Sequence, residues 1–201
     1  MPRATKEASE QTAREILRIA TSHFCEFGYG GTDLNTIATS AGVTRGAVYH
    51  HYSGKATLFE AVVTALHRRL QNEIETSTAA LDDPWEQLEI GSIAFIDAAI
   101  DPEIMRILLI EAPAVLGWET WHRLDEEASF QSLTSLLAEM EASGEIASGS
   151  AAASGRLLSG AMNEAVMWIA AADDQLSARQ EVTNVLRTMI RSLRISSSRT
   201  D

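Results

Sequence analysis

The sequence predicts an all-α protein of about nine helices. Apolar residues recur at intervals of three and four positions along most of the 201 residues, which is the spacing of one buried helix face. No segment alternates apolar and polar residues over more than a few positions, so we expect no sheet. The helices fall into an N-terminal group of three, joined by a long helix to a larger C-terminal helical domain.

The N-terminal group contains two short helices separated by a tight break. The predicted helices are 9–27, 34–41 and 45–51. Gly28 can take the left-handed conformation that ends a helix, and Thr32 or Asp33 can cap the next one. Gly42 then breaks the chain, and Thr44 can cap the third helix. This pattern predicts a helix-turn-helix.

The remaining helices are longer. They are predicted over 55–77, from Pro84, from Pro102 to a stop or kink at Pro113, and over 118–142, 151–172 and 177–195. The clearest loop is the Gly- and Ser-rich stretch 143–154. We place a domain boundary inside the long helix, with an N-terminal domain over 1–56 (about 10–70 with that helix) and a C-terminal domain over 57–201.

The net charge of −12 is unevenly distributed. Residues 1–70 hold eight Lys and Arg against six Asp and Glu, which gives +2, and residues 71–201 hold eight against twenty-two, which gives −14. Nucleic-acid-binding domains are usually basic. The acidic residues lie outside the predicted helix-turn-helix, so this part of the chain can still approach DNA.

Several classes of protein are not expected. The first residues lack the apolar run of a secretory signal, and no run of about 18 apolar residues could span a membrane. The single cysteine, Cys25, excludes an intrachain disulfide and fits a cytoplasmic protein, in which it would simply pack. The sequence has no metal-ligand spacing, no nucleophile with a base and no Gly-rich phosphate loop. We therefore expect no metal, no cofactor and no enzymatic activity.

The third helix carries the side chains that a recognition helix needs. Thr44 and Gly46 at its start would let the backbone approach a phosphate. Arg45, Tyr49 and His50 place donors on its outer face, with His51 near the far end. Lys55, just beyond the helix, can hold a phosphate as a point charge. Each residue alone would be read as surface or core, and the ordered set is what predicts DNA binding.

The stretch from about 12 to 63 resembles the DNA-binding domain of the TetR family of transcriptional regulators. The matching positions are the helix ending in FGY, Thr32, Ile37-Ala38, Ala41-Gly42-Val43, Gly46, Tyr49, His51-Tyr52, Lys55 and Leu58-Phe59. The resemblance implies a homodimer on a pseudo-palindromic double-stranded operator, with the third helix of each subunit in a major groove. It also implies that certain residues lie at the DNA, namely Thr44, Arg45, Gly46, Tyr49, His50, His51 and Lys55, with Asn35 and Thr36 at phosphates.

The resemblance further implies that the C-terminal domain dimerises through its last two helices and binds a small molecule. We expect the dimer face to contain Leu158, Met162, Val166, Ile169, Val182, Leu186, Met189 and Leu193. For the ligand we expect a mostly apolar pocket. Its predicted lining is Phe95, Met105, Leu109, Trp118, Trp121, His122, Phe130, Leu137, Asn163 and Met167. Plain core packing is the alternative for each apolar residue of this set, and a solvated or hydrogen-bonded helix position is the alternative for His122.

Three functions remain open at this point. The first is a repressor that releases its operator when it binds a small apolar or aromatic effector. The second is a DNA-binding regulator that needs no small ligand, or an activator. The third is an enzyme with an appended helix-turn-helix, which the missing catalytic residues disfavour. The sequence does not identify the effector or the operator.

Overall fold

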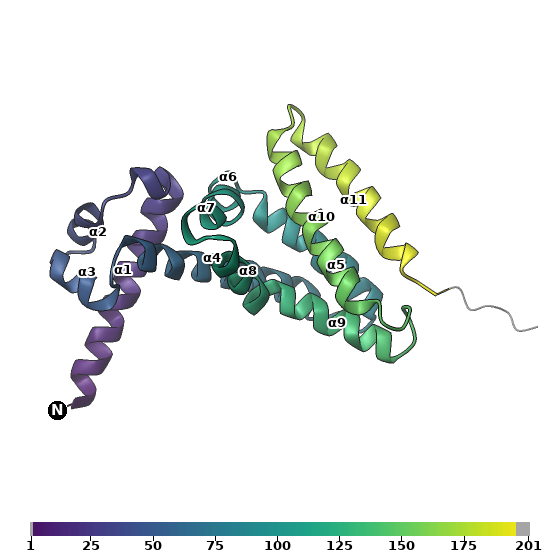
Figure 1. The fold of residues 1–201 in the computed structure, drawn as a ribbon, viewed down its shortest axis with the longest axis horizontal. Helices are drawn as coiled ribbons and strands as arrows, with labels where there is room; N and C mark the ends of the chain where they lie inside the picture. Colours follow the sequence, from purple (N-terminus) through teal and green to yellow (C-terminus); the bar gives the residue numbers. More distant parts are fainter. Residues whose placement is uncertain (1, 196–201) are drawn as a thin grey trace, which may run out of the picture. The chain divides into compact units, whose positions relative to one another are not determined.

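The computed structural model describes residues 2–195 and is helical along nearly its whole length (Figure 1). The elements are α1 (Pro2–Gly31), α2 (Leu34–Ser40), α3 (Arg45–His51), α4 (Lys55–Thr78), α5 (Pro84–Ala99), α6 (Pro102–Met105), the π-helix η1 (Arg106–Glu111), α7 (Ala112–Leu116), α8 (Trp118–Asp125), the π-helix η2 (Glu126–Phe130), α9 (Gln131–Ala142), α10 (Ala151–Ala171) and α11 (Gln175–Ser192). Because α6–η1–α7 and α8–η2–α9 each follow on without a loop, the described residues form nine helical runs, of which α1 is kinked at Gly28 and α8–η2–α9 at Ala128. The all-α prediction is confirmed.

The chain divides into two compact units. The first contains the chain up to Leu66 together with Arg106–Leu124, and the second contains His67–Met105 together with the chain from Asp125 onward. The chain therefore passes from one unit to the other inside α4, at the start of η1 and near the end of α8. These units are defined by packing, and the functional division at residues 56 and 57 stays a prediction.

The first unit is built around aromatic residues of α1 and α4. Phe24 and Phe59 are fully buried, with ring centroids 5.1 Å apart in an edge-to-face arrangement. Tyr29 adds a third ring, 5.0 Å from Phe59. Burying such large apolar side chains is the main stabilising contribution to a domain of this size. The core fixes α1 and α4 together, and it thereby supports the two short helices α2 and α3.

The second unit is held together by α10 and α11, which pack on each other and on α5 (Figure 1). Two ion pairs join α11 to α5. Arg179 makes a bidentate pair with Asp97, with Nε–Oδ1 and Nη2–Oδ2 distances of 2.5 and 2.6 Å. Arg187 Nε lies 2.7 Å from Glu89 Oε1. The bidentate geometry fixes the orientation of α11 as well as its position.

Two helical segments differ from the predictions. A stop or kink was predicted at Pro113, and a straight helix was predicted over 118–142. Pro113 does not end the helical run, which continues into α7; the departure from α-geometry is the π-helix η1 just before the proline. The predicted helix 118–142 is interrupted at Ala128, whose φ and ψ are −109° and −120°. Gly28 breaks α1 as expected.

No helix within the described residues is long and apolar enough to cross a lipid bilayer.

Candidate functional site

The turn between α2 and α3 is fixed by capping contacts. Asp33 accepts a hydrogen bond from the backbone N–H of Asn35 at 2.7 Å, and Thr44 Oγ1 accepts one from the N–H of Ala47 at 3.2 Å. Between the helices, Gly42 has a φ of +66°, a conformation that favours glycine. The caps predicted at Asp33 and Thr44 are confirmed. Together they make α2 and α3 a rigid pair despite their length of seven residues each.

The inner faces of the two short helices are buried against α1 and α4. The buried residues of the short helices are Leu34, Ile37, Ala38 and Val48, and those of the supporting helices include Ile16, Ala20, Phe24, Leu58, Phe59 and Val62. The hydroxyl of Tyr52 donates to the carbonyl of Ala13 at 3.1 Å and ties the end of α3 to α1. Burial raises the pKa of Tyr52, so this hydroxyl keeps its proton.

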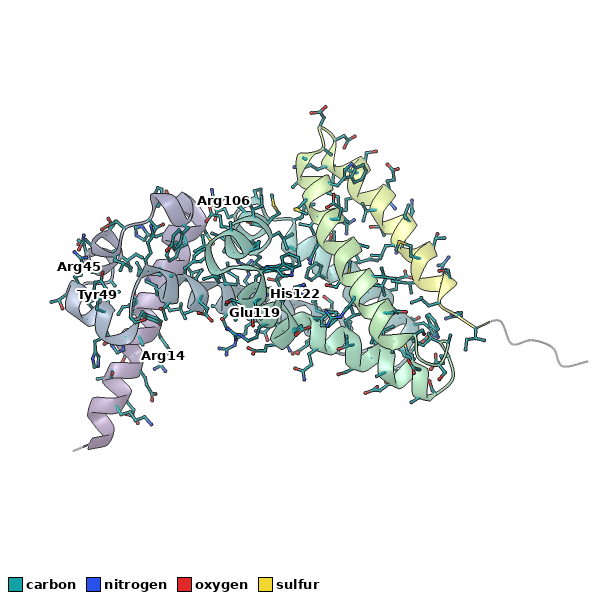
Figure 2. The ribbon with its side chains drawn as sticks, in the orientation of Figure 1. Arg14, Arg45, Tyr49, Arg106, Glu119 and His122 are labelled. Atoms are coloured by element: carbon teal, nitrogen blue, oxygen red, sulfur yellow. The ribbon has the colours of Figure 1, made fainter. Side chains whose placement is uncertain are left out.

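The outer face of α3 presents polar side chains on this apolar base. Thr44, Arg45, Gly46, Tyr49 and His50 are all exposed. The Arg45 guanidinium donates to the Tyr49 hydroxyl at 3.2 Å and lies 5.3 Å from the centre of its ring (Figure 2). The contact with Tyr49 is the main reason that the pKa of Arg45 is raised. Arg45 and Tyr49 therefore form one pre-arranged donor surface one helical turn long.

Gly46 has no structural reason inside the chain to be glycine. Its φ is not positive, and an added Cβ would have a single neighbour, Thr44 Oγ1 at 3.7 Å, which is ordinary contact. Glycine in a helix is less favourable than alanine by roughly 0.5–1 kcal/mol. The cost is explained if another molecule approaches the start of α3 closely.

The other residues predicted at DNA surround this surface. Asn35 and Thr36 are exposed in the first turn of α2, beside the capping carboxylate of Asp33. His51 is half-buried, with its ring centroid 5.1 Å from that of His50. Lys55 is also half-buried, and its ammonium lies 4.4 Å from the centre of the Tyr29 ring. Lys55 thus starts from a cation–π contact that positions it at the head of α4.

One acidic residue lies beside the basic surface. The hydrogen bond from the N–H of Asn35 is the main cause of the lowered pKa of Asp33, and Arg45 adds a smaller favourable charge. Asp33 therefore stays ionised and neutralises the N-terminus of α2. The basic side chains of α3 and the start of α4 remain available to a polyanion.

The ten residues predicted to line an effector pocket are divided between the two units. The first unit contains Leu109, Trp118, Trp121 and His122, and the second contains Phe95, Met105, Phe130, Leu137, Asn163 and Met167. Trp121 is buried and donates from Nε1 to the carbonyl of Leu108 at 2.7 Å, whereas Trp118 is 65% exposed. The α8 aromatic residues pack with one another in the first unit, because the chain returns there at η1.

The second unit contains a cavity of about 150 Å³ between α4, α5, α9 and α10. Its lining is Ile74, Glu75, Thr78, Gln87, Leu88, Gly91, Ser92, Phe95, Phe130, Ser132, Leu133, Leu136, Ser159 and Met162. Of the predicted set, Phe95 and Phe130 line it. Leu137 is fully buried in the core instead. The cavity wall is mostly apolar and carries hydroxyl, amide and carboxylate groups but no Lys, Arg or His.

The residues predicted for the dimer face of α10 lie inside the protomer. Leu158, Met162, Val166 and Ile169 are each 6% exposed or less, so this prediction needs correction. On α11, Leu186 is buried, Val182 and Leu193 are half-buried and Met189 is 39% exposed. The large apolar side chains of α10 and α11 that are exposed are Leu157, Trp168, Leu176, Val185 and Met189. The exposed face of α10 is therefore rotated by one residue from the predicted one.

Twelve of the fourteen cavity-lining residues were not in the predicted set, because their types are common in helices and cores. Gly91, Ser92 and Ser159, for example, give no signal of a ligand. Small residues facing larger ones across a helix pair are a weak indication of a cavity, and they become informative only when the pairing of helices is known. Among the described residues, no group of three His, Cys, Asp or Glu side chains is placed to hold a metal ion.

Two family models match the chain. Residues 16–62 match the family described as "Bacterial regulatory proteins, tetR family", and residues 85–193 match "Tetracyclin repressor-like, C-terminal domain". The first match covers α2, α3 and the parts of α1 and α4 that support them. The second covers more than half of the chain.

Individual proteins give the same result. The chain is 32% identical over 110 residues to the HTH-type transcriptional regulator AcrR of Shigella flexneri, which is 54% of this chain and 51% of AcrR. It is 36% identical over 92 residues to the probable acrEF/envCD operon repressor of Escherichia coli K12, covering 44% of this chain and 40% of that protein. The chain thus spans about half or less of the length of these curated relatives. A crystal structure of a TetR-family transcriptional regulator from Pectobacterium atrosepticum superposes with a TM-score of 0.77 at 29% identity, over 94% of this chain and 97% of the other.

Proposed function

Because the chain belongs to the TetR family, we propose that it is a DNA-binding transcriptional regulator whose α3 enters the major groove of an operator. One observation supports this most directly: a capped, rigid helix exposes Arg45 and Tyr49 as a joined donor surface beside Gly46. Arg and Tyr can contact base edges or phosphates, and a glycine at the start of the helix permits close approach of the backbone.

The regulator acts as a homodimer, as TetR-family regulators do on operator DNA. We place the second copy on the exposed face of α10 and α11, where Trp168 is 47% exposed. Gly160 lies in the middle of α10, and no atom would come within 4 Å of an added Cβ there. A glycine at such a position suits close approach of another helix. In this dimer the two α3 helices would contact half-sites whose centres lie about 34–36 Å apart, and an operator for such a dimer is pseudo-palindromic.

We assign the regulator as a repressor that releases its operator when an effector binds. A relative with 36% identity is itself described as a probable operon repressor. The effector would occupy the cavity in the second unit. A cavity of about 150 Å³ is the size that holds a single small aromatic molecule, whereas drug-sized ligands need roughly 300 Å³ or more. A larger effector must therefore widen the cavity.

The lining of the cavity indicates the charge of its ligand. It contains no cationic side chain, and its only ionisable group is the exposed Glu75. Burying an anion there would leave it without a partner, at a cost of several kcal/mol. The effector class that fits is therefore neutral or cationic, with an apolar or aromatic body.

The single helix α4 runs from the cavity to the DNA-binding part of the chain, which consists of α1 to α3 and the start of α4. Ile74, Glu75 and Thr78 near its end line the cavity, and Leu58 and Phe59 near its start belong to the core beneath α2 and α3. An effector that displaces the end of α4 would act on the same helix that carries Lys55. Shifting the dimer fully from one state to the other needs about 5.5 kcal/mol of differential effector affinity.

DNA binding is tested by enrichment from a random library. The full-length protein is incubated with random-sequence duplexes at low salt, and the bound sequences are read. We expect an inverted repeat whose affinity falls as salt is raised, because phosphate contacts release counterions. The assignment as a DNA-binding regulator is wrong if no sequence is enriched at low salt.

The effector site is tested separately by thermal unfolding with small aromatic probes. Indole is the neutral probe and benzoate the anionic one, and Ser159→Phe is the variant that fills the cavity. We expect indole to raise the melting temperature of the unmodified protein, and benzoate and the filled variant to show no such shift. If indole has no effect on either protein, a regulator that needs no small ligand is favoured.

A further inference from the structure

The α1 helix contains a break that needs partners from elsewhere in the chain. At Gly28 the φ and ψ angles are +70° and 177°, so the helical hydrogen-bond ladder stops there. The last carbonyls before such a break have no helical donor, and the first N–H groups after it have no helical acceptor. On the two sides of Gly28 here are the carbonyls of Phe24 and Cys25, before the break, and the N–H of Tyr29, after it.

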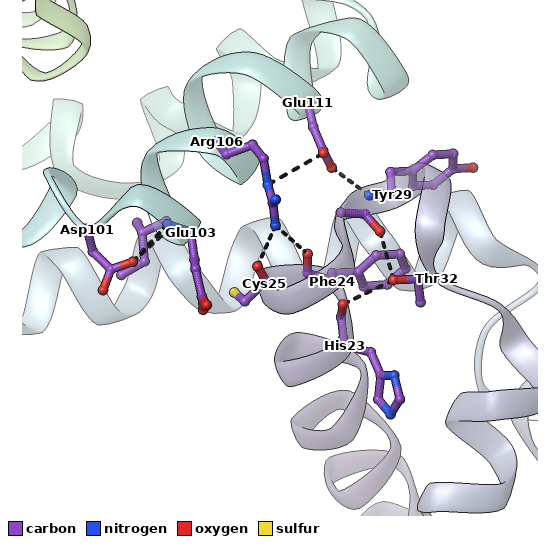
Figure 3. Close-up of polar contacts among 11 residues, drawn as sticks. His23, Phe24, Cys25, Tyr29, Thr32, Asp101, Glu103, Arg106 and Glu111 are labelled. Carbon is purple, nitrogen blue, oxygen red and sulfur yellow. Dashed lines mark hydrogen bonds and ion pairs between the residues drawn. The ribbon is translucent and has the colours of Figure 1, made fainter. Parts of the chain in front are cut away.

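Arg106 and Glu111, the first and last residues of η1, supply these partners (Figure 3). Arg106 Nη2 donates to the carbonyl of Phe24 at 3.3 Å and to that of Cys25. Glu111 Oε2 accepts from the N–H of Tyr29 at 2.6 Å. The two side chains also pair with each other, with Arg106 Nε 3.7 Å from Glu111 Oε1. A cation thus lies at the C-terminal end of one helical segment and an anion at the N-terminal end of the next, which is the favourable arrangement at both ends.

The π-helical register of η1 is what places both side chains on α1. Residues five apart lie about 140° apart around an α-helix, since each residue advances about 100°. In a π-helix the hydrogen bond joins residues i and i+5, so Arg106 and Glu111 are on the same side. If η1 took the α-helical register, one of the two side chains would turn away from the break.

Gly28 also fits tightly against Glu111. A Cβ at Gly28 would lie 2.5 Å from Glu111 Oε1, so the carboxylate occupies the space that a side chain would take. Thr32 completes the cluster, because its hydroxyl donates to the carbonyl of Gly28 at 2.7 Å and to that of His23 at 3.1 Å. The break is thus held from both sides.

The contact extends through Tyr29 to the side chain proposed to hold a phosphate. Glu111 fixes the backbone of Tyr29, and the Tyr29 ring packs on Phe59. The same ring carries the ammonium of Lys55 at 4.4 Å from its centre. Within the first unit, therefore, a continuous set of contacts runs from η1 to the head of α4.

We propose that Arg106 and Glu111 are positioning residues of the DNA-reading head, which act on Lys55 through Tyr29, and that the π-helical register of η1 holds them in place. This inference rests on the proposed DNA-binding function. It makes the segment 106–111 part of the DNA-reading unit, although the match to the DNA-binding family model covers only residues 16–62. It also identifies a change of register in η1 as a way to weaken operator binding.

The test measures operator affinity per folded dimer for a set of full-length variants. Glu111→Ala removes both the acceptor for Tyr29 and the charge, and Glu111→Gln keeps an acceptor and removes the charge. Glu119→Ala removes an exposed carboxylate of α8 and is the matched control. Each change is also made in a Lys55→Met background. Binding to the duplex enriched by the unmodified protein is followed by fluorescence anisotropy, with the folded fraction taken from circular dichroism.

We expect Glu111→Ala to weaken operator binding on the order of tenfold, Glu111→Gln to have a smaller effect, and Glu119→Ala to stay near the unmodified protein. In the Lys55→Met background, Glu111→Ala should cause little further loss, because the two residues act through one contact. A purely structural role predicts a lower melting temperature with normal affinity per folded dimer, or equal losses in both backgrounds. Either result would overturn the inference while leaving DNA binding intact.

Hydrogen exchange of the Tyr29 amide gives a readout that does not need DNA. We expect this amide to exchange faster in Glu111→Ala than in the unmodified protein or in Glu119→Ala. If its exchange is unchanged, the contact does not hold the break and the inference is wrong. If the unmodified protein enriches no duplex at all, the proposed function fails, and with it the role of the pair in DNA binding.

Discussion

Replacing Gly46 with alanine should stabilise the protein and weaken its binding to DNA. An added Cβ meets only Thr44 Oγ1, at 3.7 Å, and the backbone needs no positive φ. Because alanine is a better helix former than glycine, the free energy of unfolding should rise. We expect an increase of about 0.5 kcal/mol, the low end of the usual range, since Gly46 lies in the first turn of α3. For a chain of this length that corresponds to a rise of about 1–2 °C in the melting temperature. The added methyl group would stand between the start of α3 and the phosphate that it approaches, and we expect a loss of affinity of tenfold or more, about 1.4 kcal/mol.

Both effects are measured on the same sample, by thermal unfolding and by anisotropy with the enriched duplex. Gly30→Ala is the matched control, because Gly30 is also exposed, helical and without a neighbour within 4 Å of an added Cβ. We expect the control to gain stability and to bind normally. If Gly46→Ala binds the operator as tightly as the unmodified protein, the argument that DNA approaches Gly46 closely is refuted.

Three further predictions concern other parts of the molecule. Tyr49→Ala and Lys55→Ala should each weaken operator binding on the order of tenfold or more, while the dimer persists in size-exclusion chromatography, and normal binding would contradict their assignment. Trp168→Glu should dissociate the dimer, and an unchanged elution volume would exclude this face. Burial lowers the pKa of His67 from 6.5 to about 4, and neither ring nitrogen has a hydrogen-bond partner among the described residues. The unfolded chain therefore binds a proton more readily, so stability should fall by about 3 kcal/mol as the pH falls from about 6.5 to about 4. His67→Leu should remove this dependence in chemical unfolding at several pH values, and an equal slope in both proteins would count against it.

The helix-turn-helix was predictable from the sequence because the residues that define it are close together in the chain. Asp33 and Thr44 cap helices that directly follow them, and Gly28 and Gly42 break the chain where the backbone takes a positive φ. Each feature depends on a few neighbouring residues, so a sequence alone can indicate it. The exposed row on α3 follows from the same register, because Arg45 and Tyr49 are four residues apart and so lie on one face, and Tyr49 is about 100° from the buried Val48.

The C-terminal domain was harder to predict because α10 is apolar on more than one side. Leu157 and Leu158 are adjacent, as are Trp168 and Ile169, and in each pair one residue is buried and the other exposed. Helical periodicity cannot decide which member of such a pair faces the core. The choice depends on α5, α9 and α11, which pack on α10 from distant parts of the sequence. The predicted dimer face was therefore displaced by one residue.

The π-helix η1 has no sequence signal at all. The segment reads RILLIE, which fits an ordinary α-helix equally well. Arg106 and Glu111 gain their meaning only from the broken end of α1, about 80 residues earlier in the chain. A long-range contact of this kind also explains why the aromatic residues of α8 that were predicted to line an effector pocket lie in the first unit.

Some glycines of this chain are required by the fold itself, and others are not. The structure distinguishes the two kinds, whereas the sequence alone does not. Gly28 is required from inside, because its φ is positive and Glu111 fills the space beside it. Gly46 and Gly160 are helical, exposed and free of close neighbours, so the folded chain by itself would be more stable with alanine at both positions. A regulator of this kind needs close approach at two surfaces, one to DNA and one to a second copy. Gly46 lies on the proposed DNA surface and Gly160 on the proposed dimer surface, whereas Gly30, which also lacks an internal reason, lies on neither and serves as the control. Close approach of another molecule is therefore one physical argument that applies to both α3 and α10.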